Sequence, residues 1–219
     1  SGVLHPAGRS LSDGGGGRQV SAAGDAPEVA VACAVAAAAR CLSAVSPEAV
    51  VYACTSGSFV NGIEGARRIS RSIGETVNAH AVTTSEGLLE ALDALDITRL
   101  AVATPYVPKL TGRLEDFLAA DGREVVGCAG LGLDKLIWTV PYRVTADLVR
   151  QANTPDAEAV FVACTNLPTY DIIEPLEQEL GKPVLTANQV TAWAGLRRLG
   201  VPLVGGGQRL AGAIREFLP

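Results

Sequence analysis

Short apolar stretches alternate with longer amphipathic stretches along most of the chain. The short stretches are rich in Val and Ala, as are the buried strands of parallel sheets. They predict strands at residues 49–53, 79–82, 99–104, 124–127, 159–163 and 184–186. The longer stretches repeat apolar residues at helical spacing and predict helices at 27–44, 61–73, 85–95, 110–121, 142–152, 171–180, 189–199 and 211–218. This alternation is typical of an α/β fold with helices on both faces of a parallel sheet.

Two segments of the chain, 110 positions apart, are near-copies of one another. Residues 50–58 read VVYACTSGS, and residues 160–168 read VFVACTNLP. Each is a short apolar strand that ends in Ala-Cys-Thr and continues through small polar residues. Ligands bind at the carboxyl ends of strands in open α/β sheets. The repeat therefore predicts two similar half-domains, and if these face each other, Cys54 and Cys164 converge on one small molecule.

A weaker repeat supports this duplication. Residues 82–84 read VTT and precede an amphipathic helix, and residues 184–186 read VLT and precede another. Chance similarity among Ala- and Leu-rich units is the alternative explanation.

The two repeated cysteines are candidates for reactive thiols. Each follows a strand and precedes small polar residues, so we expect its sulfur to lie near unpaired backbone N–H groups and a helix N-terminus. Both features lower the pKa of a thiol. The same N–H groups can bind a carboxylate, together with the side chains of Thr55, Ser56, Thr165 and Asn166.

Tyr106 is a further candidate, in the Thr-Pro-Tyr-Val-Pro motif at residues 104–108. It follows the strand predicted at 99–104, so it falls on the same ligand-binding edge. Its phenol is suited to hydrogen-bond a carboxylate. Packing across a proline-rich turn is the alternative interpretation.

The other cysteines, Cys33, Cys41 and Cys128, are expected to be small buried hydrophobic residues. No Cys-x-x-Cys pair is present, and His5 and His80 lie far from every cysteine in the sequence. A zinc site is therefore not supported. A hydrolase with a Cys-His pair is the weaker reading for the same reason.

Composition excludes several classes of function. The 219 residues are 48% hydrophobic and 19% charged, with a net charge of -5, so we expect no nucleic-acid partner. The longest apolar stretch, at 29–39, is too short to span a bilayer, and no membrane association is expected. No export or lipidation signal is visible, which predicts a cytoplasmic protein. The Gly/Ser-rich segment at 9–25 lacks phosphate-loop spacing and predicts a flexible loop.

The motifs together resemble the aspartate/glutamate racemase superfamily. The resemblance is closest to the branch that holds maleate cis-trans isomerases and arylmalonate decarboxylases. The motifs that carry it are Ala-Cys-Thr-Ser-Gly-Ser-Phe at 53–59, Ala-Thr-Pro-Tyr-Val at 103–107, Gly-Leu-Gly-Leu at 130–133, Cys-Thr-Asn-Leu at 164–167 and Ala-Asn-Gln at 187–189.

This resemblance implies two pseudo-symmetric α/β lobes, each a parallel sheet flanked by helices, with the active site between them. The expected division places residues 1–83 and 187–219 in the first lobe and residues 84–186 in the second. It also implies catalysis without a cofactor or metal. Carried onto this chain, the family's nucleophile falls on Cys54 and its proton-handling cysteine on Cys164. Tyr106 matches the family's tyrosine, and the carboxylate-holding turns fall on Thr55-Ser56 and Thr165-Asn166.

Two motifs depart from the family. Where the family has Pro-Ser-Ser-Asn-Thr, this chain has PAGRS at 6–10, and after residues 130–133 it has Asp-Lys-Leu where a further Asn is common. The decarboxylases of this branch keep only the second cysteine, so the pair here favours an isomerase or racemase.

The resulting hypothesis is a cis-trans isomerase of a small unsaturated dicarboxylate such as maleate. A racemase or decarboxylase of a small carboxylic acid is one alternative. A non-catalytic binding protein on the same scaffold is another. We further expect a small-molecule carboxylate as the substrate and a homo-oligomeric assembly.

Overall fold

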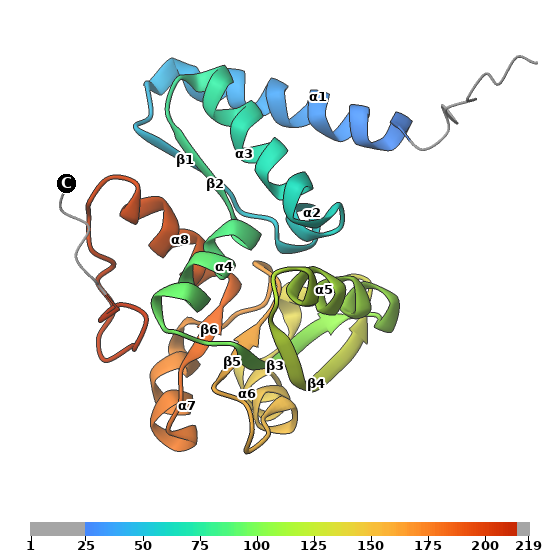
Figure 1. The fold of residues 1–219 in the computed structure, drawn as a ribbon, viewed down its shortest axis with the longest axis vertical. Coiled ribbons are helices and arrows are strands. Elements are labelled where there is room, and N and C mark those ends of the chain that lie inside the picture. Colours follow the sequence, from blue (N-terminus) through green and yellow to red (C-terminus); the bar gives the residue numbers. More distant parts are fainter. Residues whose placement is uncertain (1–24, 214–219) are drawn as a thin grey trace, which may run out of the picture.

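The computed structural model describes residues 25–213, with side chains from residue 34 onward, and these residues form two parallel sheets with packed helices (Figure 1). The glycine-rich segment at 9–25 lies almost wholly outside the described residues, as does the divergent motif at 6–10. Most of the helix predicted at 211–218 also lies outside them, and residues 211–213 form a turn rather than a helix.

The first sheet pairs β1 (Ala49–Tyr52) with β2 (His80–Thr83). Its two faces are covered by different helices. Val50 packs with Ala39 and Ile73 of α1 (Asp25–Leu42) and α3 (Gly62–Val77). Val51 points the opposite way, as expected for alternating strand residues, and meets Gly195 of α8 (Ala187–Arg197).

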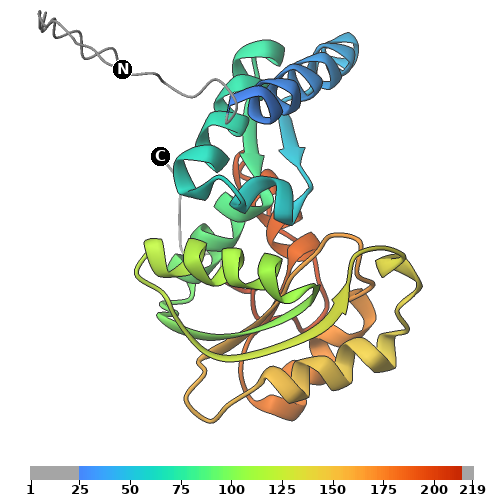
Figure 2. The same cartoon turned by 90° about the vertical axis from the view of Figure 1, so that its right-hand side faces the viewer.

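The second sheet has the strand order β4-β3-β5-β6. Its strands are β3 (Arg99–Tyr106), β4 (Glu124–Leu133), β5 (Ala159–Val162) and β6 (Val184–Thr186), all parallel. Leu100, Val102 and Phe161 face a core shared with α4 (Thr84–Ala94) and α5 (Pro108–Ala120). Alternate residues such as Ala101 and Val160 face a core shared with α6 (Tyr142–Ala152) and α7 (Ile173–Leu180). Figure 2 shows α5 and α6 on opposite faces of this sheet. The predicted α/β class, with helices on both faces of parallel sheets, is confirmed.

The strand pairing supports the internal duplication. Tyr52 pairs with Thr83 at the end of β1, and Val162 pairs with Thr186 at the end of β5. Thr83 and Thr186 then play the same part, because each caps the following helix by accepting a hydrogen bond from the backbone N–H three residues on. The weaker repeat in the sequence thus corresponds to two equivalent strand-cap-helix units.

The helices of those two units, α4 and α8, pack against each other. The hydroxyls of Thr84 and Thr191 lie 2.8 Å apart and form a buried hydrogen bond. Gly87 allows the close approach, because a Cβ there would lie 2.8 Å from the carbonyl oxygen of Val190.

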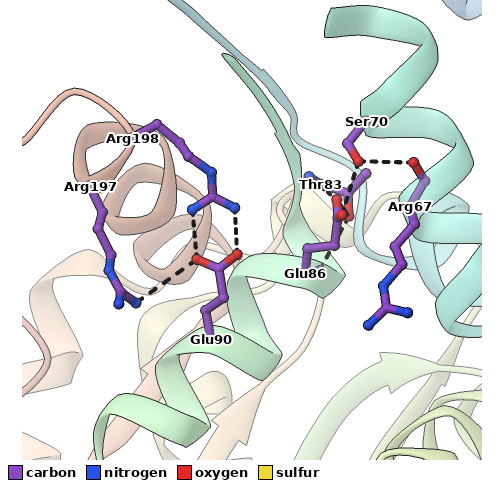
Figure 3. Close-up of polar contacts among 7 residues, drawn as sticks. All are labelled: Arg67, Ser70, Thr83, Glu86, Glu90, Arg197 and Arg198. Carbon is purple, nitrogen blue, oxygen red and sulfur yellow. Dashed lines mark hydrogen bonds and ion pairs between the residues drawn. The ribbon is translucent and has the colours of Figure 1, made fainter. Parts of the chain in front are cut away.

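Carboxylates of α4 attach it to its neighbours (Figure 3). Glu90 accepts hydrogen bonds from the guanidinium of Arg198 on the α8 side, one of them at 2.7 Å. Glu86 accepts a hydrogen bond from Ser70 of α3 at 2.9 Å and completes the cap at Thr83. The helix that precedes β3 is therefore anchored to both α3 and α8.

Some boundaries differ from those expected. β3 continues through Pro105 to Tyr106, and β4 continues to Leu133. The predicted helix at 61–73 is preceded by a separate short helix, α2 (Thr55–Phe59), because Gly62 breaks the helical path with φ +69°. Within residues 25–213, no helix is both long enough and apolar enough to cross a bilayer.

Candidate active site

Cys54 lies at the carboxyl end of β1 and is the residue immediately before α2. Its backbone is extended, with φ -143° and ψ 103°, and its N–H donates to the carbonyl of Tyr52 at 3.0 Å. Its own carbonyl accepts the first helical hydrogen bond, from Ser58, at 3.1 Å. The half-buried thiol thus lies beside a helix N-terminus, as the sequence predicted.

Cys164 follows β5 and has a different local geometry. Its φ is +84°, in the left-handed region that non-glycine residues rarely adopt. Such a conformation costs about 1–3 kcal/mol and is commonly found at functional sites. The sulfur accepts hydrogen bonds from the backbone N–H groups of Asn166 and Leu167.

The expected lowering of the pKa is wrong for Cys164. Burial raises the pKa of its thiol above the usual value, and this outweighs the opposing effect of the two backbone N–H groups and of the Tyr106 hydroxyl. No helix begins at Thr165 to supply a dipole, because a turn and the 3-10 segment Tyr170–Ile172 precede α7. Burial therefore favours the neutral thiol form of Cys164.

The structure brings the two cysteine motifs together. The hydroxyl of Thr165 donates to the carbonyl of Ala53 at 3.1 Å, and the Asn188 side chain donates to the carbonyl of Thr165 at 2.9 Å. The sulfurs are close enough that negative charge on Cys54 contributes to the raised pKa of Cys164. Both sulfurs also raise the pKa of the Tyr106 phenol.

Two buried hydroxyls lie at this junction without a well-aligned hydrogen-bond partner in the described part of the chain, those of Thr55 and Tyr106. The residues are only 2% and 4% exposed. The Tyr106 phenol lies beside Cys164 and Thr55, and burial raises its pKa. Its ring is held by an edge contact with Phe59, 6.2 Å between centroids. Unpaired buried hydroxyls are costly, so these two are suited to bind a polar ligand.

The other residues predicted to bind a carboxylate differ in the hydrogen-bond donors that they have available. Ser56 is half-buried on α2, next to Thr55. The hydroxyl proton of Thr165 is used in the bond to Ala53, and Asn166 is exposed but directs its backbone N–H to Cys164. The second turn therefore offers backbone donors more than side chains.

A buried hydroxyl network supports the Cys54 segment and was not predicted from the sequence. Thr84 donates to the carbonyl of Tyr52 at 3.2 Å, and Ser58 donates to the carbonyl of Thr55 at 2.8 Å. The hydroxyls of Ser58 and Ser85 are 2.6 Å apart. The first turn of α4 thus fixes the backbone on both sides of Cys54.

Tyr52 was also missed. Its phenol lies beside the Cys54 sulfur, and burial together with Cys54 raises its pKa. The signal available in the sequence was its position two residues before the cysteine, where the second copy has Val162.

The other cysteines lie apart from this junction. Cys41 and Cys128 are exposed, so their predicted burial is wrong, and the side chain of Cys33 lies outside the described residues. Cys128 is inside β4 and borders a surface hollow of about 740 Å³ between β4 and α5. Although the residue is exposed, partial desolvation of its sulfur and the neighbouring Glu115 raise the pKa of the Cys128 thiol to about 11. Among residues 25–213, no cluster of three or more His, Cys, Asp or Glu residues is placed to hold a metal ion.

Comparison with known proteins gives a consistent result. The sequence profile of the arylmalonate decarboxylase family matches residues 11–211. The chain is similar to arylmalonate decarboxylase of Bordetella bronchiseptica, with 30% identity over 159 residues, which cover 71% of this chain and 64% of that protein. The match thus spans less than two thirds of the decarboxylase. The chain is also similar to maleate isomerase of Nocardia farcinica, with 28% identity over 175 residues, covering 75% of this chain and 70% of that protein.

The fold is also similar to that of a solved relative. A cysteine-to-serine variant of Nocardia farcinica maleate cis-trans isomerase, with a covalently bound succinylcysteine intermediate, superposes with a TM-score of 0.73 at 26% identity. The superposition covers 76% of this chain and 72% of that one.

Proposed function

This chain belongs to the arylmalonate decarboxylase family, and we propose that it is a cofactor-independent cis-trans isomerase of a small unsaturated dicarboxylate such as maleate. The observation that carries the proposal is the convergence of Cys54 and Cys164 beside unpaired buried hydroxyls. The succinylcysteine intermediate of the Nocardia farcinica relative supports the same chemistry.

In the proposed reaction the Cys54 thiolate adds to one alkene carbon of maleate. A carbon–sulfur bond forms, and the π electrons move to the other alkene carbon and its carboxylate as an enediolate. The former double bond is now single, so rotation about it is fast. The enediolate then re-forms the double bond and expels the Cys54 thiolate, which releases the trans isomer, fumarate. The sequence of steps consumes no proton, electron or co-substrate.

Cys164 acts in this scheme as a thiol. Burial favours the protonated thiol, which can donate its proton to the neighbouring carbon as charge develops there, and the resulting Cys164 thiolate takes the same proton back as Cys54 is expelled. A thiolate at this position would instead repel both the substrate and the Cys54 thiolate. The two cysteines thus have different roles in this scheme.

The substrate carboxylates are held, in this proposal, by neutral donors. Thr55 and Tyr106 supply buried hydroxyls without a well-aligned hydrogen-bond partner among the described residues, Ser56 adds a third hydroxyl, and the turn at Thr165-Asn166 supplies backbone N–H groups. These donors are fixed in place before the substrate binds, which favours the developing enediolate. They also explain how a chain with a net charge of -5 accommodates a dianion.

We also propose the two-lobe division, with residues 1–83 and 187–219 in one lobe and residues 84–186 in the other. Each described sheet then falls in one lobe, and the substrate lies between the lobes. The hydrogen bond from Thr165 to Ala53 and the contact of α4 with α8 would connect them.

The test is the conversion of maleate to fumarate, followed by proton NMR. We expect the wild-type protein to be active and Cys54→Ala to lose at least about 1,000-fold in turnover. Cys128→Ala is the matched control, because Cys128 is a cysteine remote from the site, and it should keep full activity. Equal turnover by wild type and Cys54→Ala would refute the proposal.

Decarboxylation is the second candidate, favoured by the 30% identity to the Bordetella bronchiseptica enzyme. Release of CO₂ from an arylmalonate, with no conversion of maleate, would select it. Exchange of solvent deuterium into the α-carbon of a recovered chiral acid would indicate a racemase. If none of these substrates reacts or binds, the chain is a non-catalytic member of the family.

A further inference from the structure

Tyr52 lies next to the proposed nucleophile. It is the last residue of β1, two positions before Cys54, and its side chain is half-buried. The backbone bends sharply between them, because the N–H of Cys54 donates to the carbonyl of Tyr52 at 3.0 Å. This bend allows the phenol and the thiol to point to the same side.

The Tyr52 hydroxyl and the Cys54 sulfur both lie beside Gly57. A Cβ at Gly57 would lie 2.6 Å from the Tyr52 hydroxyl oxygen and 3.1 Å from the Cys54 sulfur. Both polar atoms therefore rest against one residue of α2 that has no side chain. Among the described residues, Tyr52 and Cys54 also interact directly, side chain to side chain.

A residue of α4 holds the backbone next to Tyr52 and Cys54. Thr84 of α4 donates to the carbonyl of Tyr52 at 3.2 Å, and Thr84 is itself fully buried. The backbone that carries the phenol is thus held by a hydrogen bond from α4.

We propose that the Tyr52 hydroxyl donates a hydrogen bond to the Cys54 sulfur, and that this bond stabilises the thiolate both before addition and as it leaves. The contribution to turnover rests on the proposed isomerase function. The effect on the sulfur does not, because it is present without substrate.

The chemistry gives Tyr52 a role that differs from that of Tyr106. In the elimination step the carbon–sulfur bond breaks and its electron pair returns to sulfur. A donor that points at sulfur strengthens as this charge appears, so it acts mainly on the transition state. Tyr106 lies instead beside Cys164 and Thr55, where the carboxylate is proposed to bind.

The first test measures alkylation of Cys54 by iodoacetamide at several pH values, with each cysteine followed by peptide mass spectrometry. Tyr52→Phe keeps the ring and removes the hydroxyl. We expect it to slow alkylation of Cys54 at neutral pH by about 10-fold and to move the pH profile of that reaction to higher pH. The exposed thiol of Cys41 is an internal control and should react at an unchanged rate.

Gly57→Ala is the second variant, and it tests the same contact with Tyr52 intact. Its methyl group would separate the hydroxyl from the sulfur, while alanine is well tolerated in a helix. We expect the same direction of change as for Tyr52→Phe. Tyr142→Phe is the matched control, because Tyr142 lies on α6 and interacts with Asp171 rather than with a cysteine.

Turnover provides a readout that a purely structural role would not produce. Tyr52→Phe should lower kcat for maleate by about 10-fold and leave KM within about twofold, because Tyr52 acts on sulfur and not on a carboxylate. An unchanged pH profile of Cys54 alkylation in both Tyr52→Phe and Gly57→Ala would overturn the inference. If Cys54→Ala keeps its activity, the isomerase proposal is refuted. The alkylation test of the contact between Tyr52 and Cys54 still applies in that case.

Discussion

The hydroxyl of Thr165 donates a hydrogen bond to the carbonyl of Ala53 at 3.1 Å, joining residues 112 positions apart in the chain. Each partner is next to one of the paired cysteines. The contact therefore sets the relative position of Cys54 and Cys164 directly, through one residue on either side.

Removing this hydrogen bond should affect turnover more than stability. Thr165→Val keeps the shape of the side chain and loses the donor. Because the bond is solvent-exposed, we expect a loss of about 0.5 kcal/mol in unfolding free energy, with a fall of about 10-fold in maleate turnover from misplacement of the thiols. Thr139→Val is the control, since Thr139 makes an exposed local hydrogen bond to Leu136. Equal kinetic effects of the two variants would argue against a positioning role for Thr165.

The left-handed backbone at Cys164 leads to an unusual order of stabilities. At most buried positions, Gly is less stable than Ala, because Gly has more conformational entropy in the unfolded chain. With φ at +84° this order of stability should reverse. We expect the free energy of unfolding of Cys164→Gly to exceed that of Cys164→Ala by about 1 kcal/mol. Thermal unfolding of the two variants measures this. A less stable Gly variant would show that Cys164 carries no backbone strain.

The Tyr106 hydroxyl should influence the proton affinity of Cys164. The hydroxyl lowers the pKa of Cys164, while burial raises it. Tyr106→Phe removes only the lowering effect, so the pKa of Cys164 should rise further and its alkylation should require a higher pH. Alkylation of Cys164 in a Cys54→Ser background, with and without Tyr106→Phe, measures the shift. A shift to lower pH would contradict the assigned geometry.

Glu158 predicts a pH dependence of stability that is separate from the active site. Its carboxylate accepts hydrogen bonds from the backbone N–H groups of Thr98 and Arg99, which lower its pKa to about 2. A lowered carboxylate pKa stabilises the fold above the unfolded value, about 4.3, and this contribution disappears as pH falls towards 2. Glu158→Ala should therefore lower the melting temperature at pH 7, with a difference that shrinks by pH 3. A constant difference across this range would exclude the carboxylate as its source.

Much of the fold could be predicted because its strands are short, apolar and bounded by clear helical patterns. The helix Tyr142–Ala152 and the strand Val184–Thr186 begin and end where expected. β3 was expected to end before Pro105, which lacks an N–H. The strand continues because β3 pairs with β5 only as far as Ala103, and its pairing with β4 changes register beyond Thr104.

The paired cysteines could be found from the repeat, but their protonation could not. Both were expected to have lowered pKa values, whereas burial, a property of the tertiary structure, raises the pKa of Cys164. Similarly, Trp138 is 60% exposed, while Trp193 is buried against α4 and the second sheet. The local sequence pattern predicts neither the pKa of Cys164 nor the exposure of the two tryptophans, because both depend on which helices and strands cover the residue.

The central claim is that Cys54 forms a covalent bond to a dicarboxylate while Cys164 acts as a thiol beside it. The most direct measurement is peptide mass spectrometry of wild type and of Cys164→Ser after incubation with maleate and rapid acid quenching. The account predicts a succinyl adduct on Cys54, more abundant in Cys164→Ser, with Cys41 and Cys128 unmodified. An unmodified Cys54 in both proteins, while wild type converts maleate to fumarate, would contradict it.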